Sequence, residues 1–277
     1  MSKIKKQLDY KGKIRNHFDR LAPEREAWIK KSGAFYSEDI RCMKELIIPN
    51  SKVLEIGCGN GNLLASLNPS VGIGVDISKE MISKAKSKYK NLEFIVADIE
   101  DTGCVKNLNK VFDFIIISDT IGYFKDIQKT LDMLHKVCNA DTRIIVAYYS
   151  PFWEPILNLA ARIKLKMPEL TKALLNETDI SSLLNSSKFE TVKKQKKIIF
   201  PFKLLGVGRF VNRFLSCLPI LSNLCIRNYV IARSLKAIAK DLPTSASVII
   251  PCRNEKGNIK IALNRLPLFT KAIIVIV

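Results

Sequence analysis

The chain has 277 residues, which is room for one large domain, or for one domain and part of another, and excludes a lone small module. Apolar residues make up 47% and charged residues 26%, a balance that excludes a disordered chain, a collagen and a coiled coil. The formal net charge is +19. Residues 151–240 hold 16 basic and 5 acidic side chains, whereas residues 51–150 hold 12 of each. This excess predicts an anionic partner for the later block, unless the lysines are scattered over solvated faces.

The seven cysteines are an odd number and form no C-x-x-C pair, which indicates a reducing cytosol without disulfides. No histidine cluster accompanies them, so no metal site is expected. The first 16 residues lack the apolar core of a secretion signal. The uncharged and mainly apolar stretch at residues 214–226 is shorter than the roughly 20 residues that a membrane-spanning helix needs. A cytoplasmic location is therefore expected.

The pattern of apolar residues predicts helices over residues 9–48 and then a regular strand and helix alternation. Strands are expected at residues 53–56, 72–77, 92–96, 112–118 and 143–149, with helices at 62–67, 79–89 and 127–138. Such alternation is typical of a parallel sheet that helices cover on both faces. The sequence thus predicts an open α/β domain with a helical N-terminal preface.

The alternation ends near residue 150. Helical segments are expected at 153–166, 168–175 and 179–185, followed by strands at 189–200 and 228–233 that would pair as an antiparallel hairpin. The basic and apolar stretch 201–227 between those strands is predicted to be a helical lid over the sheet, or a lid that also touches a membrane interface through its apolar and basic side chains. The predicted domain covers residues 1–240, with its core at 50–150 and a lid or insert at 151–227.

A new pattern begins at residue 245. A strand at 248–250, a turn at 251–255, a helix at 257–266 and a strand at 272–277 are predicted. One strand-helix-strand unit of this size cannot enclose a core of its own. We therefore expect residues 245–277 to be the truncated start of a further domain and the sequence to be the front end of a longer protein.

A glycine-rich turn, Glu55-Ile56-Gly57-Cys58-Gly59-Asn60-Gly61, follows the first strand and opens the next helix. Glycines spaced in this way let the backbone turn sharply and let a ligand approach without meeting a Cβ. A dinucleotide site would place its third glycine at position 62, which is Asn62, so NAD and FAD are disfavoured.

Two acidic residues end the next strands. Asp76 follows the second strand, where a carboxylate can accept hydrogen bonds from both hydroxyls of a ribose, and Asp98 follows the third, where it can accept from an exocyclic adenine amine. The carboxyl ends of neighbouring parallel strands open onto one crevice. The glycine turn and the two acids together predict a nucleoside site.

The stretches VLEIGCGNGNLL, GVDISKEMISKAK and VADIED resemble the class I S-adenosylmethionine-dependent methyltransferases over residues 50–150, and more loosely over 15–240. The resemblance implies a Rossmann-like, doubly wound sheet and S-adenosyl-L-methionine as cofactor. It also implies that the glycine turn cradles the methionine part and the ribose, that the acid of the second strand binds the ribose and that the residue after it packs on adenine. The cofactor residues so implied are Glu55, Gly57, Gly59, Gly61, Asp76, Ile77, Asp98 and Ile99.

The fourth strand ends at Ser118-Asp119, where this family faces its acceptor. The Asn/Asp-Pro-Pro-aromatic tetrad of nucleobase-amine methyltransferases is missing here, so amine methylation of DNA is disfavoured. Asp119 is the carboxylate best placed to orient or deprotonate an acceptor, although it could equally cap a helix. His17, in a segment that resembles the one closing over the cofactor, is the second catalytic candidate, while Tyr36 and Tyr123 are expected to wall the cavity.

Residues 247–277, from SVIIPCRNE to the last apolar run, resemble the start of a family 2 glycosyltransferase. The resemblance implies that Pro251, Asn254 and Glu255 hold the base of a nucleotide sugar, in a domain too incomplete to transfer sugar.

The leading hypothesis is therefore O-methylation of a saccharide or lipid-linked glycan, with an anionic membrane or lipid carrier as a further partner at the inner face of the membrane. Methylation of an unrelated quinone-like or hydroxyl compound is one alternative. A non-enzymatic nucleic-acid-binding module is the other, and nucleic acid is disfavoured as a partner.

Overall fold

The computed structural model describes residues 3–199, 219–241, 246–251, 259–266 and 270–276. The chain divides into two compact units, residues 1–237 and residues 238–277. Most of the predicted lid at 201–227 lies outside the described residues, so the lid prediction is not tested there.

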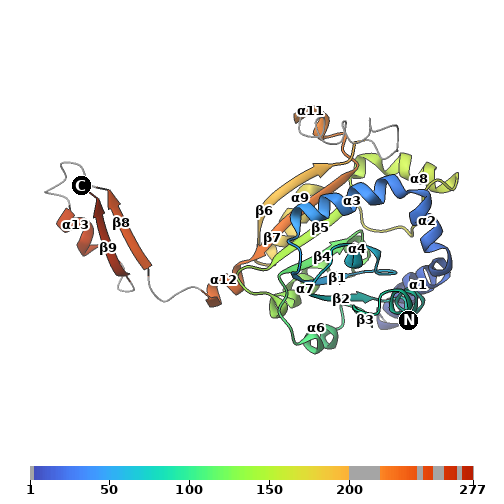
Figure 1. Cartoon of the computed structure of the whole chain (residues 1–277), viewed down its shortest axis with the longest axis horizontal. Coiled ribbons are helices and arrows are strands. Elements are labelled where there is room, and N and C mark those ends of the chain that lie inside the picture. The colour runs from blue at the N-terminus through green and yellow to red at the C-terminus, as the bar shows by residue number, and fades with distance from the viewer. Residues whose placement is uncertain (1–2, 200–218, 242–245, 252–258, 267–269, 277) are drawn as a thin grey trace. The chain divides into compact units, whose positions relative to one another are not determined.

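The larger unit begins with the predicted helical preface, which consists of α1 (Lys3–Leu21), α2 (Arg25–Lys31) and α3 (Gly33–Leu46). A short 3-10 turn at Ala22–Glu24, with Pro23 inside it, joins α1 to α2. Figure 1 shows these helices in blue along one side of the sheet.

Seven strands form one sheet in the order β3-β2-β1-β4-β5-β7-β6 (Figure 1). Their bounds are β1 Lys52–Ile56, β2 Val71–Asp76, β3 Glu93–Val96, β4 Phe114–Ser118, β5 Arg143–Tyr149, β6 Phe189–Lys197 and β7 Arg227–Ser234. The strands β1 to β5 pair in parallel, whereas β7 pairs antiparallel with both β5 and β6. The predicted α/β class, with a mostly parallel sheet and an antiparallel C-terminal hairpin, is confirmed.

Alternate strand residues face two separate apolar layers, because successive side chains of a strand point to opposite faces. In β4, Ile115 and Ile117 pack on one face and Ile116 on the other, and all three are fully buried. The first face is covered by α6 (Thr102–Leu108), α7 (Ile127–Leu134) and α9 (Glu177–Ser186), and the second by α3, α4 (Asn62–Ser66) and α5 (Lys79–Lys88). Both faces of the sheet are therefore buried, which leaves the carboxyl ends of the strands as the open edge.

Two local predictions differ from the structure. The helix α6 was not expected, because its seven residues include Gly103; the Asp101 side chain caps it by accepting from the Gly103 N–H at 3.3 Å. The predicted helix at 168–175 is wrong. The backbone of this segment forms hydrogen bonds with the turn after β4 instead of within a helix. The Ala173 N–H donates to the Gly122 carbonyl at 3.0 Å, and the Leu170 carbonyl accepts from the Tyr123 hydroxyl at 3.3 Å.

The smaller unit has the predicted strand-helix-strand order, with β8 (Ala246–Pro251), α13 (Ile259–Asn264) and β9 (Thr270–Ile276), and its two strands pair in parallel. The helix α12 (Leu235–Asp241) leads out of the larger unit. Pro251 ends β8, and Asn254 and Glu255 lie outside the described residues. Among the described helices, none has the length and apolar character that crossing a bilayer requires.

Candidate active site

The glycine-rich turn between β1 and α4 has a backbone that only glycine adopts readily, since Gly57, Gly59 and Gly61 all have φ between 53° and 76°. A Cβ on Gly57 would lie 2.0 Å from the Thr120 Oγ1, so this position also needs glycine for space. A Cβ on Gly59 would meet nothing within 4 Å. The turn therefore presents bare backbone to open space at Gly59.

Asp76, at the end of β2, is fixed beside this turn. Its Oδ2 accepts from the Gly59 N–H at 2.8 Å, and its Oδ1 accepts from the Ser78 N–H at 2.9 Å. Burial raises the pKa of Asp76, and the two N–H donors oppose that rise. Each carboxylate oxygen keeps a second lone pair, so Asp76 can still accept from hydroxyl donors in the cavity.

A first cavity opens at this edge of the sheet. Six of the predicted cofactor residues line it, namely Gly57, Gly59, Asp76, Ile77, Asp98 and Ile99. Tyr36 and Tyr123 line it too, as the sequence predicts. The apolar side chains of Ile77 and Ile99 lie at the end of the cavity away from β4, as expected for residues that flank a base.

Two predicted cofactor residues do not line this cavity. Gly61 begins α4, where a Cβ would lie 2.6 Å from the Phe94 ring. Glu55 is only 3% exposed, and its Oε2 accepts from the Leu64 N–H at 3.0 Å. Burial raises the pKa of Glu55 to about 8. In this structure Glu55 anchors the first turn of α4 from inside the sheet.

The helix α1 closes the base end of the first cavity with Lys11, Ile14 and Phe18. The Lys11 ammonium contacts the Asp98 Oδ1 at 3.1 Å and also pairs with Glu100. Asp98 therefore keeps one carboxylate oxygen free of Lys11, while α1 is tied to the loop after β3.

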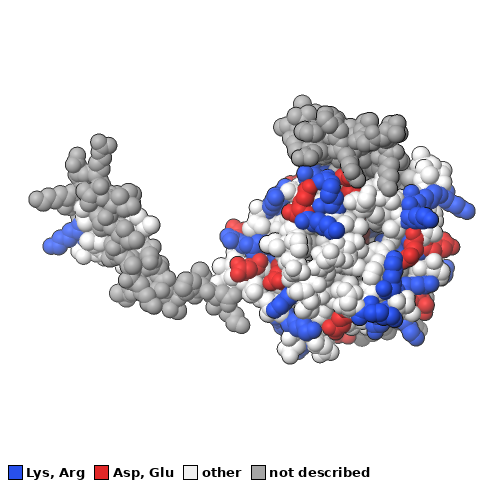
Figure 2. Space-filling model, in the orientation of Figure 1, with Lys and Arg blue, Asp and Glu red and all other residues white. Residues whose placement is uncertain are grey.

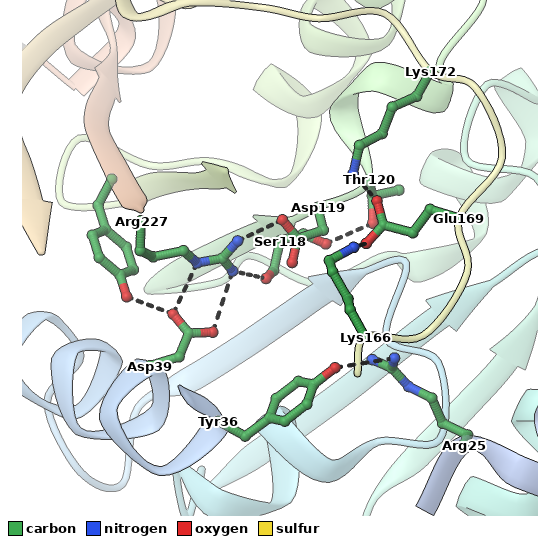
Figure 3. Close-up of polar contacts among 11 residues, drawn as sticks. Arg25, Tyr36, Asp39, Ser118, Asp119, Thr120, Lys166, Glu169, Lys172 and Arg227 are labelled. Atoms are coloured by element: carbon green, nitrogen blue, oxygen red, sulfur yellow. Dashed lines mark hydrogen bonds and ion pairs between the residues drawn. The ribbon is translucent and has the colours of Figure 1, made fainter. Parts of the chain in front are cut away.

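Asp119 lies at the opposite end of the cavity, just after β4, with a left-handed φ of 56°. It does not cap a helix, because the 3-10 turn at Ile121–Tyr123 starts after Thr120. Its carboxylate instead pairs with the Arg227 guanidinium (Figure 3). Arg227 is fully buried and also donates to both carboxylate oxygens of Asp39, at 3.0 and 3.2 Å, and to the Ser118 Oγ at 2.7 Å.

A second polar cluster faces Asp119 from the segment after α8 (Glu154–Arg162). There the Glu169 carboxylate pairs with two ammonium groups, those of Lys166 and Lys172 (Figure 3). These two cations lower the pKa of Glu169 to about 2, against the opposing effect of burial. The Lys166 and Lys172 ammonium groups also lie 5.0 and 5.8 Å from the centre of the Tyr149 ring.

Arg25, the first residue of α2, reaches the end of the first cavity at which Asp119 lies. Its Nη1 lies 3.3 Å from the Tyr36 hydroxyl and 3.2 Å from the Met167 sulfur, and its Nε is buried without a hydrogen-bond partner. No sequence pattern singled out Arg25 or the Lys166-Glu169-Lys172 cluster. Arg227 was expected among the basic side chains of the lid that could touch a membrane interface, and that expectation is wrong, because Arg227 is fully buried. The signals of these residues were weak: a basic residue after Pro23-Glu24, an arginine opening an apolar strand, and closely spaced charges.

A second cavity lies beyond Asp119. Its walls come from the ends of β4 and β5, from one side of α8, and from the segment 166–175. Asp119, Tyr149 and Glu169 line both cavities. These three residues therefore form the junction between the two spaces.

The histidines lie away from this junction. His17 is half-buried on α1, with its Nε2 at 3.3 Å from the Pro168 carbonyl, and among the described residues it is not part of either cavity wall. His135 is structural: its ring nitrogens bond the Ser234 hydroxyl and the Ser187 carbonyl, and its ring stacks on Phe189. Over the ranges that the structure describes, no three His, Cys, Asp or Glu side chains are grouped to hold a metal ion.

Comparison with known proteins identifies the family. Residues 47–199, more than half of the chain, match a family model described as a methyltransferase domain. The chain belongs to this methyltransferase family. The prediction of a class I S-adenosylmethionine-dependent methyltransferase domain is thereby confirmed.

Relatives in sequence match parts of the chain. An uncharacterized protein of Methanocaldococcus jannaschii is 30% identical over 47% of this chain and 60% of its own length. A malonyl-[acyl-carrier protein] O-methyltransferase of Acetivibrio thermocellus is 26% identical over 66% of this chain and 70% of its own. A demethylmenaquinone methyltransferase of Staphylococcus saprophyticus is 27% identical over 56% and 70%, respectively. The chain thus spans three fifths to seven tenths of these relatives.

Solved structures share the fold at low identity. A possible histamine N-methyltransferase of Thermotoga maritima superposes with a TM-score of 0.59 at 17% identity, over 79% of this chain and 99% of that one. The magnesium protoporphyrin IX methyltransferase of Synechocystis, solved with bound S-adenosylhomocysteine, superposes with a TM-score of 0.56 at 16% identity, over 81% and 99%.

Proposed function

We propose that the first cavity holds S-adenosylmethionine and that the second admits the acceptor of its methyl group. The observation that carries this proposal is the shared wall of Asp119, Tyr149 and Glu169. Methyl transfer requires the nucleophile to approach in line with the bond that breaks. Two cavities that meet at one end supply such an approach.

The residues of the first cavity fit the cofactor. Gly59 leaves open space for it, Asp76 can accept from the ribose hydroxyls, and Ile77 and Ile99 offer apolar contacts to the base. The free oxygen of Asp98 can accept from the adenine amine. At the far end, the Arg25 guanidinium has a buried N–H without a partner, which suits the methionine carboxylate. When bound, the cofactor supplies a methyl group on a positively charged sulfur.

Asp119 is then a positioning group beside the transferred methyl rather than a free base, because Arg227 holds its carboxylate. The catalytic role predicted for His17 stays a hypothesis, and its support is that His17 contacts the carbonyl of Pro168, which lines the second cavity.

Calorimetry with S-adenosylmethionine tests the cofactor part. Wild type should bind in the micromolar range, and Asp76→Ala should lose binding, because the ribose hydroxyls lose their acceptor. Asp113→Ala, which changes an aspartate at the opposite end of the sheet, is the control and should bind as wild type does. Unchanged binding by Asp76→Ala would refute the placement of the ribose.

The identity of the acceptor is proposed from two sources, the relatives in sequence and the resemblance of residues 247–277. The relatives named above act on a demethylmenaquinone and on a malonyl group carried by a protein, and both bear acidic or quinone-like oxygens. A saccharide acceptor rests only on the resemblance of residues 247–277 to a glycosyltransferase start. The parallel strand-helix-strand order of the smaller unit is compatible with that resemblance. We retain the saccharide acceptor as a hypothesis, and an assay of methyl transfer from S-adenosylmethionine to saccharides would test it.

Contact with an anionic membrane is proposed from α8 and its flanks. Phe152, Ile156, Leu159 and Ile163 recur at helical spacing and are 53–66% exposed, on the side of α8 that does not line the second cavity. The exposed Lys164 follows this apolar stripe, so acyl chains and anionic headgroups would both find partners. On the face of the larger unit in Figure 2, Lys and Arg are otherwise interspersed with Asp and Glu, a distribution that does not favour a nucleic-acid track.

Liposome flotation tests this contact. The protein should float with vesicles that contain anionic lipid, and the double substitution Ile156→Ser, Leu159→Ser should abolish flotation. Val111→Ser, at another exposed apolar residue, is the matched control. Equal flotation of the double variant and the control would exclude α8 as the contact.

A further inference from the structure

The junction between the two cavities carries three ionisable groups of fixed charge. Lys166 and Lys172 share Glu169, and all three side chains are 18–23% exposed. An ammonium group has three N–H donors, so Lys166 and Lys172 keep donors that Glu169 does not use. Because the site is half-buried, an ion pair between these donors and an anion in the second cavity is screened less than on an open surface.

The same junction offers no free base among the described residues that line it. Asp119 is paired with Arg227, and Glu169 is paired with two lysines. Burial raises the pKa of Tyr149 and of the nearby Tyr36, so both phenols stay protonated. Glu154 lines the second cavity but not the first, away from the methyl group. An acceptor that needs deprotonation would find no proton acceptor at the junction.

The rest of the second cavity is lined by polar and apolar side chains. The larger apolar ones are Ile121, Leu157, Leu170, Leu174 and Leu175. Ammonium donors at one end and apolar side chains further along fit an amphipathic acid whose charged group lies at the junction.

We propose that the acceptor is an organic acid with an apolar body, which binds as its carboxylate beside Lys166 and Lys172 and is converted to a methyl ester. This inference rests on the proposed function. One carboxylate oxygen forms the new bond to the methyl carbon, the carbon–sulfur bond breaks, and its electron pair stays on sulfur. No proton moves, and the negative and positive charges cancel as the bond forms, which a water-poor cavity favours.

Binding is tested by calorimetry on the full chain saturated with S-adenosylhomocysteine, using decanoate, decanol and decyl phosphate as probes. Decanoate should bind at least tenfold more tightly than decanol. Lys166→Gln and Lys172→Gln should each weaken decanoate binding by roughly fivefold to tenfold, as expected for a partly buried charge pair, and leave decanol unchanged. The control Lys136→Gln, at an exposed lysine outside both cavities, should change neither.

The reaction is tested with S-adenosylmethionine and decanoate, where mass spectrometry should detect methyl decanoate. The rate of transfer at saturating decanoate should not rise between about pH 7 and pH 9, because no base is required.

Equal affinity for decanol and decanoate, no decanoate binding, a preference for decyl phosphate, or a rate of transfer that rises with pH over that range would each overturn the inference. Absence of S-adenosylhomocysteine binding would instead refute the proposed function, so the two failures are distinguishable.

Discussion

The Arg227 guanidinium joins Asp39 of α3 to Asp119 at the end of β4, so one fully buried cation holds two carboxylates from distant parts of the sequence (Figure 3). The Tyr229 hydroxyl also donates to Asp39. This network fixes the preface and the antiparallel hairpin to the edge of the sheet where the cavities meet.

Replacing Arg227 should strongly destabilise the folded protein. Arg227→Met is expected to lower the free energy of unfolding by about 3–5 kcal/mol, because it leaves the buried Asp39 carboxylate without its cation and removes the ion-pair partner of Asp119. Urea unfolding measures the change. Arg233→Met, on the same strand but in an exposed pair with Glu190, should cost no more than about 1 kcal/mol. Similar losses in the two variants would contradict the importance of the network.

Gly57 and Gly59 of the turn should respond differently to substitution by alanine. Gly59→Ala is expected to lose about 1–2 kcal/mol of stability from its left-handed backbone, and to bind S-adenosylhomocysteine poorly because the new methyl group occupies cofactor space. Gly57→Ala must also displace Thr120, so its melting temperature should fall further. Thermal unfolding with and without the ligand separates the two effects, and equal melting temperatures would argue against the Thr120 clash.

Glu55 should make stability depend on pH. Its folded pKa of about 8 lies above its unfolded value, so the folded state binds the extra proton and stability falls as pH rises from about 4.5 to about 8. The slope from this group can reach about 1.4 kcal/mol per pH unit. Glu55→Gln, which can still accept from the Leu64 N–H, should flatten unfolding curves over that window, when they are measured without cofactor. An unaltered pH profile would mean that Glu55 is ionised in the folded protein.

Lys11 should control how quickly the cofactor leaves. Lys11→Met removes the pairs that tie α1 to Asp98 and Glu100, so stopped-flow displacement of S-adenosylhomocysteine should be several-fold faster. Arg15→Met, at an exposed position of the same helix, serves as the comparison and should leave the rate unchanged. Identical rates in all three proteins would show that α1 does not gate the cavity.

The core of the fold could be predicted from local sequence because its signals are local. The residues Phe114–Ile117 of β4 are apolar without interruption, the glycine turn follows β1 directly, and Asp76 ends β2. The segment 168–175 could not be predicted in the same way. Its backbone bonds go to Gly122 and Tyr123, and a helical pattern in the sequence carries no information about such distant partners.

The residues of the candidate site also fall into two groups, those that local sequence predicts and those that it does not. Gly57, Gly59 and Asp76 belong to one continuous motif, so the cofactor side was predictable. Arg227 acquires its role only when β7 is placed beside β5, and Glu169 acquires its role only when its segment crosses the end of β4. A sequence pattern shows charge at these positions but not which charges meet.

The preface and the hairpin matter for any shortened form of this enzyme. Residues 47–199, the span of the family match, contain the glycine turn, Asp76 and Asp119. They lack Lys11, Arg25, Asp39 and Arg227, so a protein trimmed to that span would expose an unbalanced carboxylate where two ligands should meet. Such a fragment could keep its parallel strands and still be inactive, and engineering of this methyltransferase should therefore start from the first helix and extend through β7.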